Sequence, residues 1–544
     1  MRLCRFTFPA ALVAMLLTIL MTSASALSWS SVADLAGVQN PSANNTGNPL
    51  IKFEVTPADH RHTNISHVVG ALARTPTPSL GDDDIPTAKR TLKVSTLADL
   101  ETKIQSAEPG DHLVVANGVY TTSDWITVQK NGTQDAPVVI TAANVGGAEI
   151  KGAAGFKILD SSFIVIRGFK FTHGIRTGKG GAGMLLNGSH QIRVSRNHFR
   201  LDDTTGNSHW LMVTGNGSGH NRIDHNKFEN KPSANNFLAI YGPHKTGMSQ
   251  YDRVDHNYFL KQTYTEEGGE AVRVGVSTRA LSSGFTLFED NLFEECNGDP
   301  EVISNKSCDN TFRYNTFRNN AGSLVLRHGN RSEVYGNFFI NNAGGIRFYG
   351  DFHKIYNNYL QGGTGTGAQS TIFVTSGCTE DDKGQGSDCN RPDGVIVAFN
   401  TLINNSTNVV IGLAKRPLPP KDCIIANNLI QTNSGKVVEF NVTPLNFTWQ
   451  GNIVSGNADN GDMPSSGFIR LNPRLSSKTN GMFRLLRSSP AINKSANSSS
   501  YSYVTRDMDG QPRTGLKDVG ADEFSNGRVT RRPLNSDDVG PTAP

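Results

Sequence analysis

The sequence repeats one short pattern, and DHNKFE (224–229) and DHNYFL (255–260) are two nearly identical copies of it. In each copy a short strand-like stretch ends at an asparagine, which an aromatic or aliphatic residue follows closely. The asparagines of the copies are Asn197, Asn226, Asn257, Asn291, Asn315, Asn337, Asn358, Asn400, Asn428 and Asn452. Repetition of this kind is typical of a solenoid, in which each copy builds one coil and packs on the next.

The intervals between these asparagines favour a right-handed parallel β-helix. Most measure 21 to 34 residues, which suits one coil, and the interval of 42 contains the polar loop TEDDKGQGSD (379–388). Asparagine tolerates the bend between strands, and its amide can hydrogen-bond with the next coil. A β-sandwich or a leucine-rich repeat is the alternative, but Asn-Gly hairpin turns and a leucine consensus do not accompany the repeat. We therefore predict an all-β, right-handed parallel β-helix over residues 91–524.

The ends of the chain have a different composition. Residues 1–26 read as a secretory signal peptide, with Arg2 and Arg5 before an apolar run that is shorter than the ~20 residues needed to span a membrane. We therefore expect a secreted protein that makes no contact with the membrane. Residues 27–90 are polar and predict a flexible leader or pro-segment, and we expect residues 525–544 to be a disordered tail. TLADLETKIQSA (96–107) has the apolar spacing of a short helix that caps the first coil.

Charge and cysteine content narrow the function classes. The chain has 52 Lys and Arg residues and 48 Asp and Glu residues, so its net charge is +4. This charge allows an acidic ligand, but the sequence lacks the basic stripe of a nucleic-acid binder.

Cysteine spacing in a secreted chain predicts two disulfides, Cys296 with Cys308 and Cys378 with Cys389, and leaves Cys423 as a buried thiol. Thirteen Asn-x-Ser/Thr sequons are consistent with a glycoprotein.

Four stretches carry charged residues that a solenoid strand does not need: EEGGEAVRVG (266–275), GDPEVISNK (298–306), VLRHG (325–329) and GGIRFYGDFHK (344–354). Since a coil takes about two dozen residues, Lys306 and Arg327 should lie on adjacent coils. The acids, which include Glu267, Asp299 and Glu301, either form salt bridges or hold a hard cation such as calcium. A lysine beside a metal and an arginine has a lowered pKa and can act as a general base; alternatively it is a solvated turn residue.

The same stretches resemble the successive motifs of polysaccharide lyase family six, which includes alginate lyases and chondroitinase B. The likeness runs in order through GGEAVRVG, EVISNKSCDNTFRYNTF, LVLRHGN and GGIRFYG, within about Thr91 to Phe524. It implies that Lys306 is the Brønsted base and Arg327 the acid. It also implies two calcium ligands, Asp299 and Glu301, and a third at Glu267, where the family usually has asparagine. His328 and Arg347, with Tyr349 close by, match the region that contacts substrate.

The resemblance implies an enzyme that cleaves a polyuronate by calcium-assisted β-elimination. We expect it to be secreted, as the signal peptide indicates, and to be a monomer. Its partner would be an acidic polysaccharide, with mannuronate-rich alginate the first expectation and dermatan sulfate the second. A glycoside hydrolase on the same scaffold could use Asp299 and Glu301 as its two carboxyl groups. A uronate epimerase and a non-enzymatic carbohydrate-binding protein also remain open, and formation of an unsaturated uronate distinguishes a lyase from all three.

Overall fold

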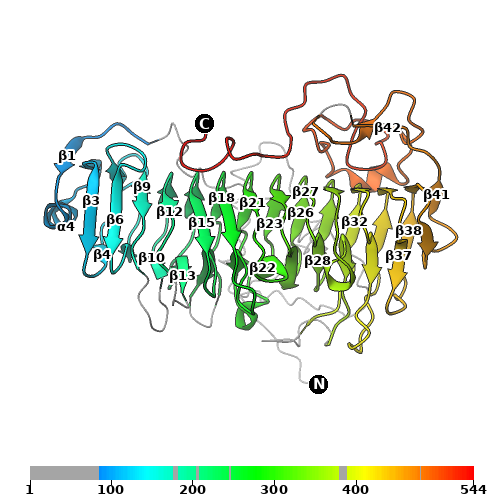
Figure 1. Cartoon of the computed structure of the whole chain (residues 1–544), viewed down its shortest axis with the longest axis horizontal. Helices are drawn as coiled ribbons and strands as arrows, with labels where there is room; N and C mark the ends of the chain where they lie inside the picture. Colours follow the sequence, from blue (N-terminus) through cyan, green and yellow to red (C-terminus); the bar gives the residue numbers. More distant parts are fainter. Residues whose placement is uncertain (1–84, 175–181, 204–207, 244–246, 379–388, 478–479) are drawn as a thin grey trace, which may run out of the picture. The chain divides into compact units, whose positions relative to one another are not determined.

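Three long parallel sheets wind around one core in the computed structural model (Figure 1), which describes residues 85–174, 182–203, 208–243, 247–378, 389–477 and 480–544. The predicted signal peptide and residues 27–84 of the predicted leader lie outside the described residues. Each coil contributes one strand to each sheet, so that neighbours in a sheet come from successive coils. This arrangement is the predicted parallel β-helix.

We name the sheets A, B and C. Sheet A comprises β1 (Arg90–Val94), β2 (Asp111–Val115), β5 (Val138–Ala142), β8 (Ile164–Arg167), β11 (Arg193–Ser195), β14 (Arg222–Asp224), β17 (Arg253–Asp255), β20 (Leu287–Glu289), β23 (Thr311–Arg313), β26 (Glu333–Tyr335), β29 (Lys354–Tyr356), β32 (Ile396–Ala398), β35 (Ile424–Ala426) and β38 (Thr448–Gln450). Sheet B comprises β3 (Gly118–Thr122), β6 (Ala148–Gly152), β9 (Phe169–Phe171), β12 (His198–Phe199), β15 (Lys227–Lys231), β18 (Tyr258–Gln262), β21 (Leu292–Glu294), β24 (Thr316–Arg318), β27 (Phe338–Ile340), β30 (Tyr359–Gln361), β33 (Thr401–Ile403), β36 (Leu429–Gln431), β39 (Asn452–Ser455) and β41 (Phe468–Arg470). Sheet C comprises β4 (Ile126–Val128), β7 (Phe156–Leu159), β10 (Ala182–Asn187), β13 (His209–Thr214), β16 (Leu238–Gly242), β19 (Val272–Val274), β22 (Glu301–Lys306), β25 (Ser323–His328), β28 (Ile346–Phe348), β31 (Ile372–Val374), β34 (Val409–Ile411), β37 (Lys436–Phe440) and β40 (Asp459–Gly461).

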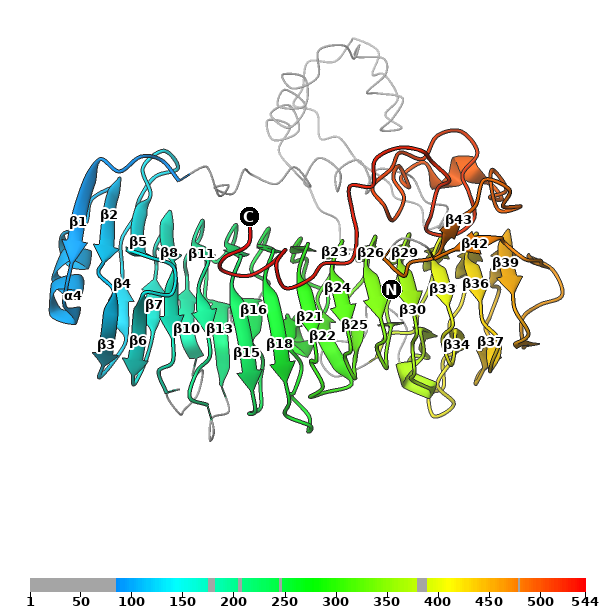
Figure 2. The same ribbon diagram turned by 45° about the horizontal axis from the view of Figure 1, so that its top comes forward.

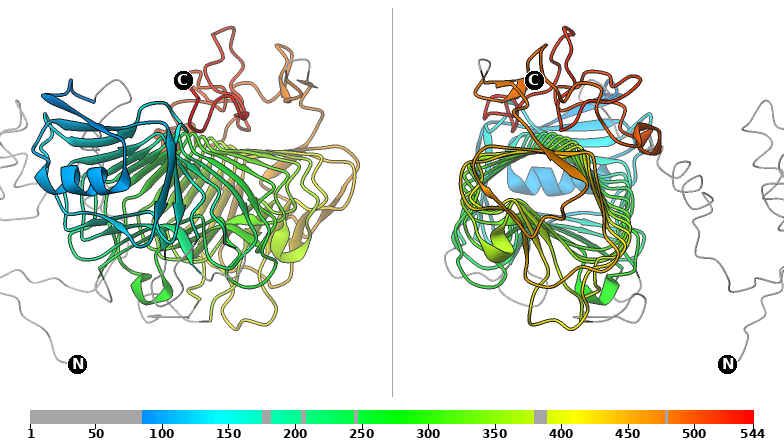
Figure 3. Two further views of the ribbon diagram at one scale, coloured as in Figure 1. Left: turned by 60° about the vertical axis from the view of Figure 1, so that its left-hand side comes forward. Right: turned by 90° about the vertical axis from the view of Figure 1, so that its right-hand side faces the viewer.

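The predicted capping helix is present as α4 (Leu97–Ser106), which lies across the N-terminal end of the coils (Figure 3). Thr96 caps it, because its side-chain oxygen accepts a hydrogen bond from the Asp99 N–H at 3.1 Å. Leu100 and Ile104 are buried against the first coil. The helix thus covers apolar core that would otherwise face water.

The repeated asparagines form a continuous ladder at the corner between sheets A and B. Each of the first nine donates a backbone N–H and a side-chain Nδ2–H to the Oδ1 of the next, at 2.9–3.1 Å. The last, Asn452, donates to the Gly467 carbonyl oxygen. The left-handed residue that bends the chain between sheets A and B is the one before each asparagine, not the asparagine itself as the sequence predicted. Examples are Arg196 (φ 54°) and Tyr314 (φ 58°), and the asparagine supplies the hydrogen bonds.

A stack of buried phenylalanines fills the interior along sheet B. Its members, one per coil with ring centroids 4.5–5.1 Å apart, are Phe171, Phe199, Phe228, Phe259, Phe293, Phe317 and Phe339. Because the sheets are parallel and in register, the same position of each coil repeats directly above the last. Residues on the outer face of one sheet therefore also stack across coils.

The chain after β41 folds back over the coils (Figure 2). Residues 471–524, including the antiparallel pair β42 (Leu475–Ser476) and β43 (Arg484–Leu485), pack on the outer face of sheet B, with Met482 and Met508 against Tyr359 and Leu429. The coils thus end near Arg470, within the predicted 91–524 domain.

Residues 525–544, which we call the strap, contradict the expectation of a disordered tail. Arg531 pairs with Asp290 at 2.8 Å and stacks over Tyr314, with 3.3 Å between the guanidinium carbon and the ring centroid. Val539 is buried against Tyr258 and Leu292. Further along, the carbonyl oxygens of Pro541 and Ala543 accept hydrogen bonds from Arg196 at 3.0 and 2.6 Å. A polar sequence is ordered here because its few apolar side chains and its backbone find partners on the coils.

The predicted disulfides are not formed in the structure. Cys296 and Cys308 are both buried, and their sulfurs bond to separate backbone groups, those of Phe259 and Ala280 among them. That pairing is wrong, since β22 runs between the two cysteines and puts them at different corners of the coil. Cys378 and Cys389 do meet, with a backbone hydrogen bond of 2.7 Å but no sulfur–sulfur bond. Cys423 is the predicted buried thiol.

Among the described residues, no helix is both long and apolar enough to cross a membrane.

Candidate active site

The charged stretches predicted from the sequence meet on the outer face of sheet C, between β19 and β28. Strand register aligns two rows of residues across these coils. The row Val272, Ile303, Leu324 and Ile346 points into the core and is completely buried. The adjacent row, which alternation turns outward, is Arg273, Ser304, Val325 and Arg347.

A β-bulge lies next to this row. Asn305 pairs with Leu326, but Lys306 pairs with His328, so that Arg327 is an extra residue in β25. Bulges of this kind re-aim side chains and are frequent beside active sites. Lys306 and Arg327 therefore come together on adjacent coils, the placement that their separation of 21 residues predicts.

Lys306 is half-buried, and its ammonium group makes no hydrogen bond or ion pair within the part of the chain that the structure describes. Its pKa is lowered, first by burial and then by the positive charge of Arg273. Arg327 adds to the lowering, while the carboxylates of Glu270 and Glu301 oppose it. Removal from water without a direct counter-ion leaves the amine more easily deprotonated than an ordinary lysine.

Arg327 is held by three neighbours. Its Nε lies 3.9 Å from a Glu301 carboxylate oxygen, its Nη1 donates to the Cys389 sulfur at 3.4 Å, and its guanidinium stacks on Tyr349 with 5.0 Å to the ring centroid. Arg416 stacks on the same ring at 4.9 Å. Burial lowers the pKa of Arg327, but Tyr349, Cys389 and Glu301 outweigh it and raise the pKa above its ordinary value. Arg327 is thus a fixed cation and hydrogen-bond donor.

Three carboxylates gather beside Lys306. Glu270, 4% exposed, forms a bidentate pair with Arg273 at 2.7 Å, and Glu301 pairs with Arg347. Asp299 accepts the Glu301 N–H at 3.0 Å. Burial, followed by repulsion from Glu270 and Glu301, raises the pKa of Asp299 to about 6. Negative charge at Asp299 is therefore only partly compensated.

Glu267, the third metal ligand expected from the sequence, is not part of this group. It is exposed on the turn before β19, and no contact joins it to Asp299 or Glu301 in the described structure. Glu270, three residues later in the same motif, is the carboxylate that approaches them.

The remaining predicted residues lie close to the pair. His328 is buried at the end of β25, with Nε2 3.3 Å from the Ser277 hydroxyl. Arg347 contacts Glu301 from two coils away, and Tyr349 is 4% exposed beneath the two guanidinium groups. His328 and Tyr349 therefore support the site from within more than they face solvent.

The donor set fits calcium in its chemistry. Calcium prefers carboxylate oxygens in irregular cages, and a divalent cation would offset the excess negative charge that raises the pKa of Asp299. Two of the three acids already have arginine partners, and the three do not form a closed cage. In the described part of the chain, the acids whose ligand atoms all lie within 4.8 Å of one another are Asp507, Asp509 and Asp522, away from sheet C.

That second acidic cluster is a structural one. The carboxylate of Asp507 accepts backbone N–H groups from Asp509, Gln511 and Glu523, and Asp509 pairs with Arg484. These bonds fold residues 507–523 into a compact closing segment rather than leaving carboxylate oxygens available.

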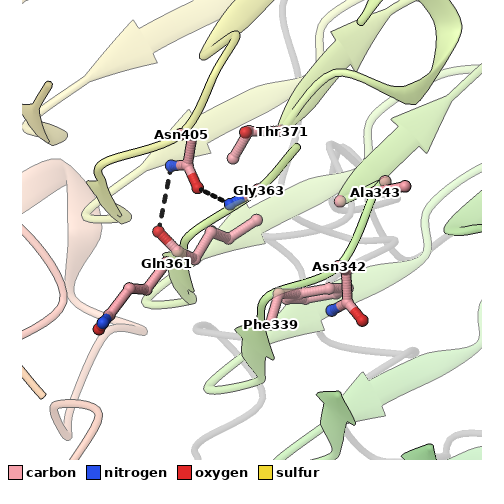
Figure 4. A pocket seen from close by; sticks show the side chains of 10 residues that line it. Phe339, Asn342, Ala343, Gln361, Gly363, Thr371 and Asn405 are labelled. Carbon is pink, nitrogen blue, oxygen red and sulfur yellow. Dashed lines mark hydrogen bonds between the residues drawn. The ribbon is translucent and has the colours of Figure 1, made fainter. Parts of the chain in front are cut away.

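The structure also contains a small cavity beside β27 and β30 (Figure 4), where Asn405 bonds to the Gly363 N–H at 2.7 Å. Its volume of about 10 Å³ is enough for one water molecule. It is too small to receive a sugar.

Sequence reasoning missed several residues of the site. Tyr241, which acts on the pKa of Arg273 and whose hydroxyl lies 3.1 Å from His209 Nε2, is within the apolar strand β16 and gives no signal of its own. Arg416 lies in a loop after β34, where no periodic pattern marks it. Cys389 was considered only as a disulfide partner. Arg273 has a place in the outward row that only the strand register reveals.

Comparison with known proteins identifies the family of the chain. A family model described as chondroitinase B matches residues 94–483, more than half of the chain. No curated protein matches the chain.

Several solved structures share the fold. A variant of AlyGC, an alginate lyase of the PL6 family, is 24% identical with a TM-score of 0.68, over 83% of this chain and 58% of AlyGC. This chain thus spans about three fifths of the length of AlyGC. A mannuronic acid specific family 6 lyase from human gut microbiota is 23% identical with a TM-score of 0.59, over 70% of this chain and 91% of that one. The lyase Pedsa3628 from Pseudopedobacter saltans is 19% identical with a TM-score of 0.60, over 83% and 99%.

At these identities the solved structures establish the fold, and the family model establishes the relationship. Together with the order of the motifs along sheet C, they show that the chain belongs to the chondroitinase B family, polysaccharide lyase family six.

Proposed function

We propose that this protein is a secreted lyase that cleaves an acidic polysaccharide by β-elimination beside a uronate carboxylate. The observation that carries the proposal is the pair of Lys306, with a lowered pKa, and Arg327, a fixed cation, on adjacent coils of one open face. Elimination needs a base for the proton at C5 and stabilisation of the oxygen that leaves C4.

Lys306 takes the C5 proton as the neutral amine, and the electron pair forms the C4–C5 double bond while the C4–O bond breaks. Arg327 donates a hydrogen bond to the departing oxygen; because its pKa is raised, it stabilises this oxygen more readily than it gives up a proton. Glu301 and Tyr349 keep the guanidinium in place. The product carries an unsaturated uronate at its new non-reducing end.

Calcium is the proposed cofactor, held by Asp299 and Glu301 with Glu270 in the place expected for Glu267. When bound, it would neutralise the uronate carboxylate and so make the C5 proton more acidic. Arg347 and Arg416 are the cations best placed to bind further carboxylates of the polymer.

Mannuronate-rich alginate is the first proposed substrate and dermatan sulfate the second. Support for alginate comes from the shared fold of a mannuronic acid specific lyase and of AlyGC, and support for dermatan sulfate from the chondroitinase B family model. We further propose that the enzyme acts as a monomer, because one chain supplies every residue of the site.

The test is to incubate the purified protein with mannuronate-rich alginate, guluronate-rich alginate and dermatan sulfate. Ultraviolet absorbance reports the unsaturated product, and a reducing-end assay reports every cleavage. We expect both signals to rise together. Reducing ends without absorbance would indicate a hydrolase that uses Asp299 and Glu301. Binding without either signal would leave an epimerase or a carbohydrate-binding protein, which proton exchange at C5 separates.

A further inference from the structure

Cys389 contacts Arg327, and Cys378 lies next to Cys389. Cys389, 4% exposed, packs against Val325 and Tyr349 on the outer face of sheet C. Its sulfur accepts a hydrogen bond from Arg327 Nη1 at 3.4 Å. Cys389 is therefore one of the groups that fix the guanidinium.

The backbones of Cys378 and Cys389 lie side by side. The Cys378 N–H donates to the Cys389 carbonyl oxygen at 2.7 Å, and the pKa of the Cys378 thiol is raised, first by burial and then by the neighbouring Cys389 side chain. With ordinary bond lengths, this backbone contact keeps the two Cα atoms within ~6.6 Å. Disulfides span Cα separations of roughly 4.4–6.8 Å, so the spacing of the two backbones suits a disulfide.

The backbone on both sides of the pair is held by neighbouring strands and loops. Gly377 and Leu418 exchange two hydrogen bonds, at 2.8 and 3.1 Å, and the Asn390 carbonyl oxygen accepts one from Gly350 at 3.2 Å. Gly350 follows Tyr349 in the chain, so the anchor of Cys389 reaches the ring on which Arg327 stacks. A shift of the Cys389 sulfur can therefore move the Arg327 guanidinium, either through their direct hydrogen bond or through Tyr349.

The other cysteines of the described chain do not share this arrangement. The sulfurs of Cys296, Cys308 and Cys423 are buried and bond to backbone groups. Cys378, by contrast, is exposed and can meet a soluble disulfide.

We propose that Cys389 is a positioning residue for Arg327 and that a reversible disulfide between Cys378 and Cys389 stiffens this support. The inference rests on the proposed function, in which Arg327 stabilises the leaving oxygen. The oxidant is a low-molecular-weight disulfide such as oxidised glutathione. The Cys378 thiolate attacks it and releases one thiol; the Cys389 thiolate then attacks the mixed disulfide and releases the second. Two protein thiols become one disulfide, and one small disulfide becomes two thiols.

The oxidised form should be the more active one. A covalent bond to Cys378 restricts the motion of the sulfur that Arg327 contacts, and small misplacements of a catalytic group are costly in rate. Reduction should lower kcat several-fold and change KM less, because Arg327 acts on the leaving oxygen more than on binding.

The experiment uses the full chain after treatment with oxidised glutathione or with dithiothreitol. Alkylation and peptide mass spectrometry count the thiols at each cysteine, and kcat and KM are measured on the same samples. Cys378→Ser is the matched control: it keeps the Cys389 thiol, so it should have the kcat of reduced wild type under both conditions. Cys389→Ala should lose at least roughly tenfold in kcat, the worth of a hydrogen bond to a charged group, and Cys389→Ser should recover part of it.

Different results would overturn the inference. The redox part fails if oxidised glutathione leaves both thiols open to alkylation, or if reduction affects wild type and Cys378→Ser equally. The positioning part fails if Cys389→Ala has the kcat of reduced wild type. If wild type is an active lyase whose kcat does not change on reduction, the redox inference is wrong and the proposed function stands. If the disulfide forms but the protein has no lyase activity, the proposed function is wrong, and so is the proposed role of Arg327 in stabilising the leaving oxygen.

Discussion

Arg327 is the extra residue of a β-bulge beside Lys306, on the neighbouring strand of sheet C. In a regular ladder these two residues would pair directly; the bulge instead pairs Lys306 with His328 and places Arg327 alongside. The positive charge of Arg327 thus lies near Lys306 and, after burial and the charge of Arg273, lowers the pKa of the lysine. The proposed base is activated partly by the residue proposed to complete the reaction.

Replacing either member of this pair should abolish most turnover while the fold persists. We expect Lys306→Gln and Arg327→Gln each to lower kcat by roughly 10²–10⁴-fold, the usual worth of a general acid or base. The measurement is the initial rate of absorbance increase, with melting temperature as a check on folding. Lys261→Gln is the matched control, since Lys261 is exposed and pairs with Glu295 on sheet B. Turnover near that of wild type in Lys306→Gln would refute the mechanism.

The pH dependence of kcat/KM should report Lys306, because only its neutral form accepts a proton. Activity is expected to rise with pH, with a midpoint below the ordinary lysine pKa of ~10.4, since burial and the charges of Arg273 and Arg327 lower the pKa. Arg273→Gln removes one positive charge and leaves Glu270 without its partner. Both effects raise the pKa of Lys306, so the rising limb should move to higher pH. A limb that stays in place, or moves to lower pH, contradicts this assignment.

Removal of divalent cations should reduce activity if calcium completes the site. We expect chelation to lower turnover and added calcium to restore it. Titration calorimetry on the chelated protein should show calcium binding that Asp299→Asn weakens, because the variant removes the acid whose charge is least compensated. Asp290→Asn, on the far side near the strap, is the control and should bind calcium as wild type does. Full activity in metal-free protein would exclude calcium from the reaction.

The strap should stabilise the coils without affecting catalysis. Val539 is 3% exposed against Tyr258 and Leu292, so Val539→Ala should cost about 1–3 kcal/mol of stability. Val529→Ala, at a site 43% exposed, should cost little. Denaturant unfolding measures both. Because the strap contacts sheets A and B and the proposed site lies on sheet C, kcat/KM should not change in either variant. Equal stability of the two variants would mean that the strap contributes no packing energy.

The repeat allowed the fold to be predicted because it is a local signal with a local cause. All ten predicted asparagines hydrogen-bond to the next coil, and each marks the corner that follows a sheet A strand. The order of the strap could not be predicted in this way. It depends on contacts with coils built hundreds of positions earlier, such as that between Arg196 and Ala543, and the strap has a polar composition of its own.

The site was predicted in part for the same reason. Stacking of coils brings Lys306 and Arg327 together, and spacing alone predicts it. Spacing does not resolve which of Glu267 and Glu270 turns toward Asp299, because that depends on the dihedral angles of one glycine-rich turn. The assumed Cys296 and Cys308 bridge failed for a related reason: closeness in sequence suggested contact, but a six-residue strand runs between them and spans roughly 20 Å.

Contacts between the strap and the early coils also bear on how the molecule is made. A solenoid can lengthen one turn at a time, and each added turn needs only the one before it. The strap instead returns to His256 and Arg196, which were synthesised long before it. These contacts can form only after the strap has been synthesised. A chain that ends before residue 525 should therefore keep its coils but unfold and be degraded more easily.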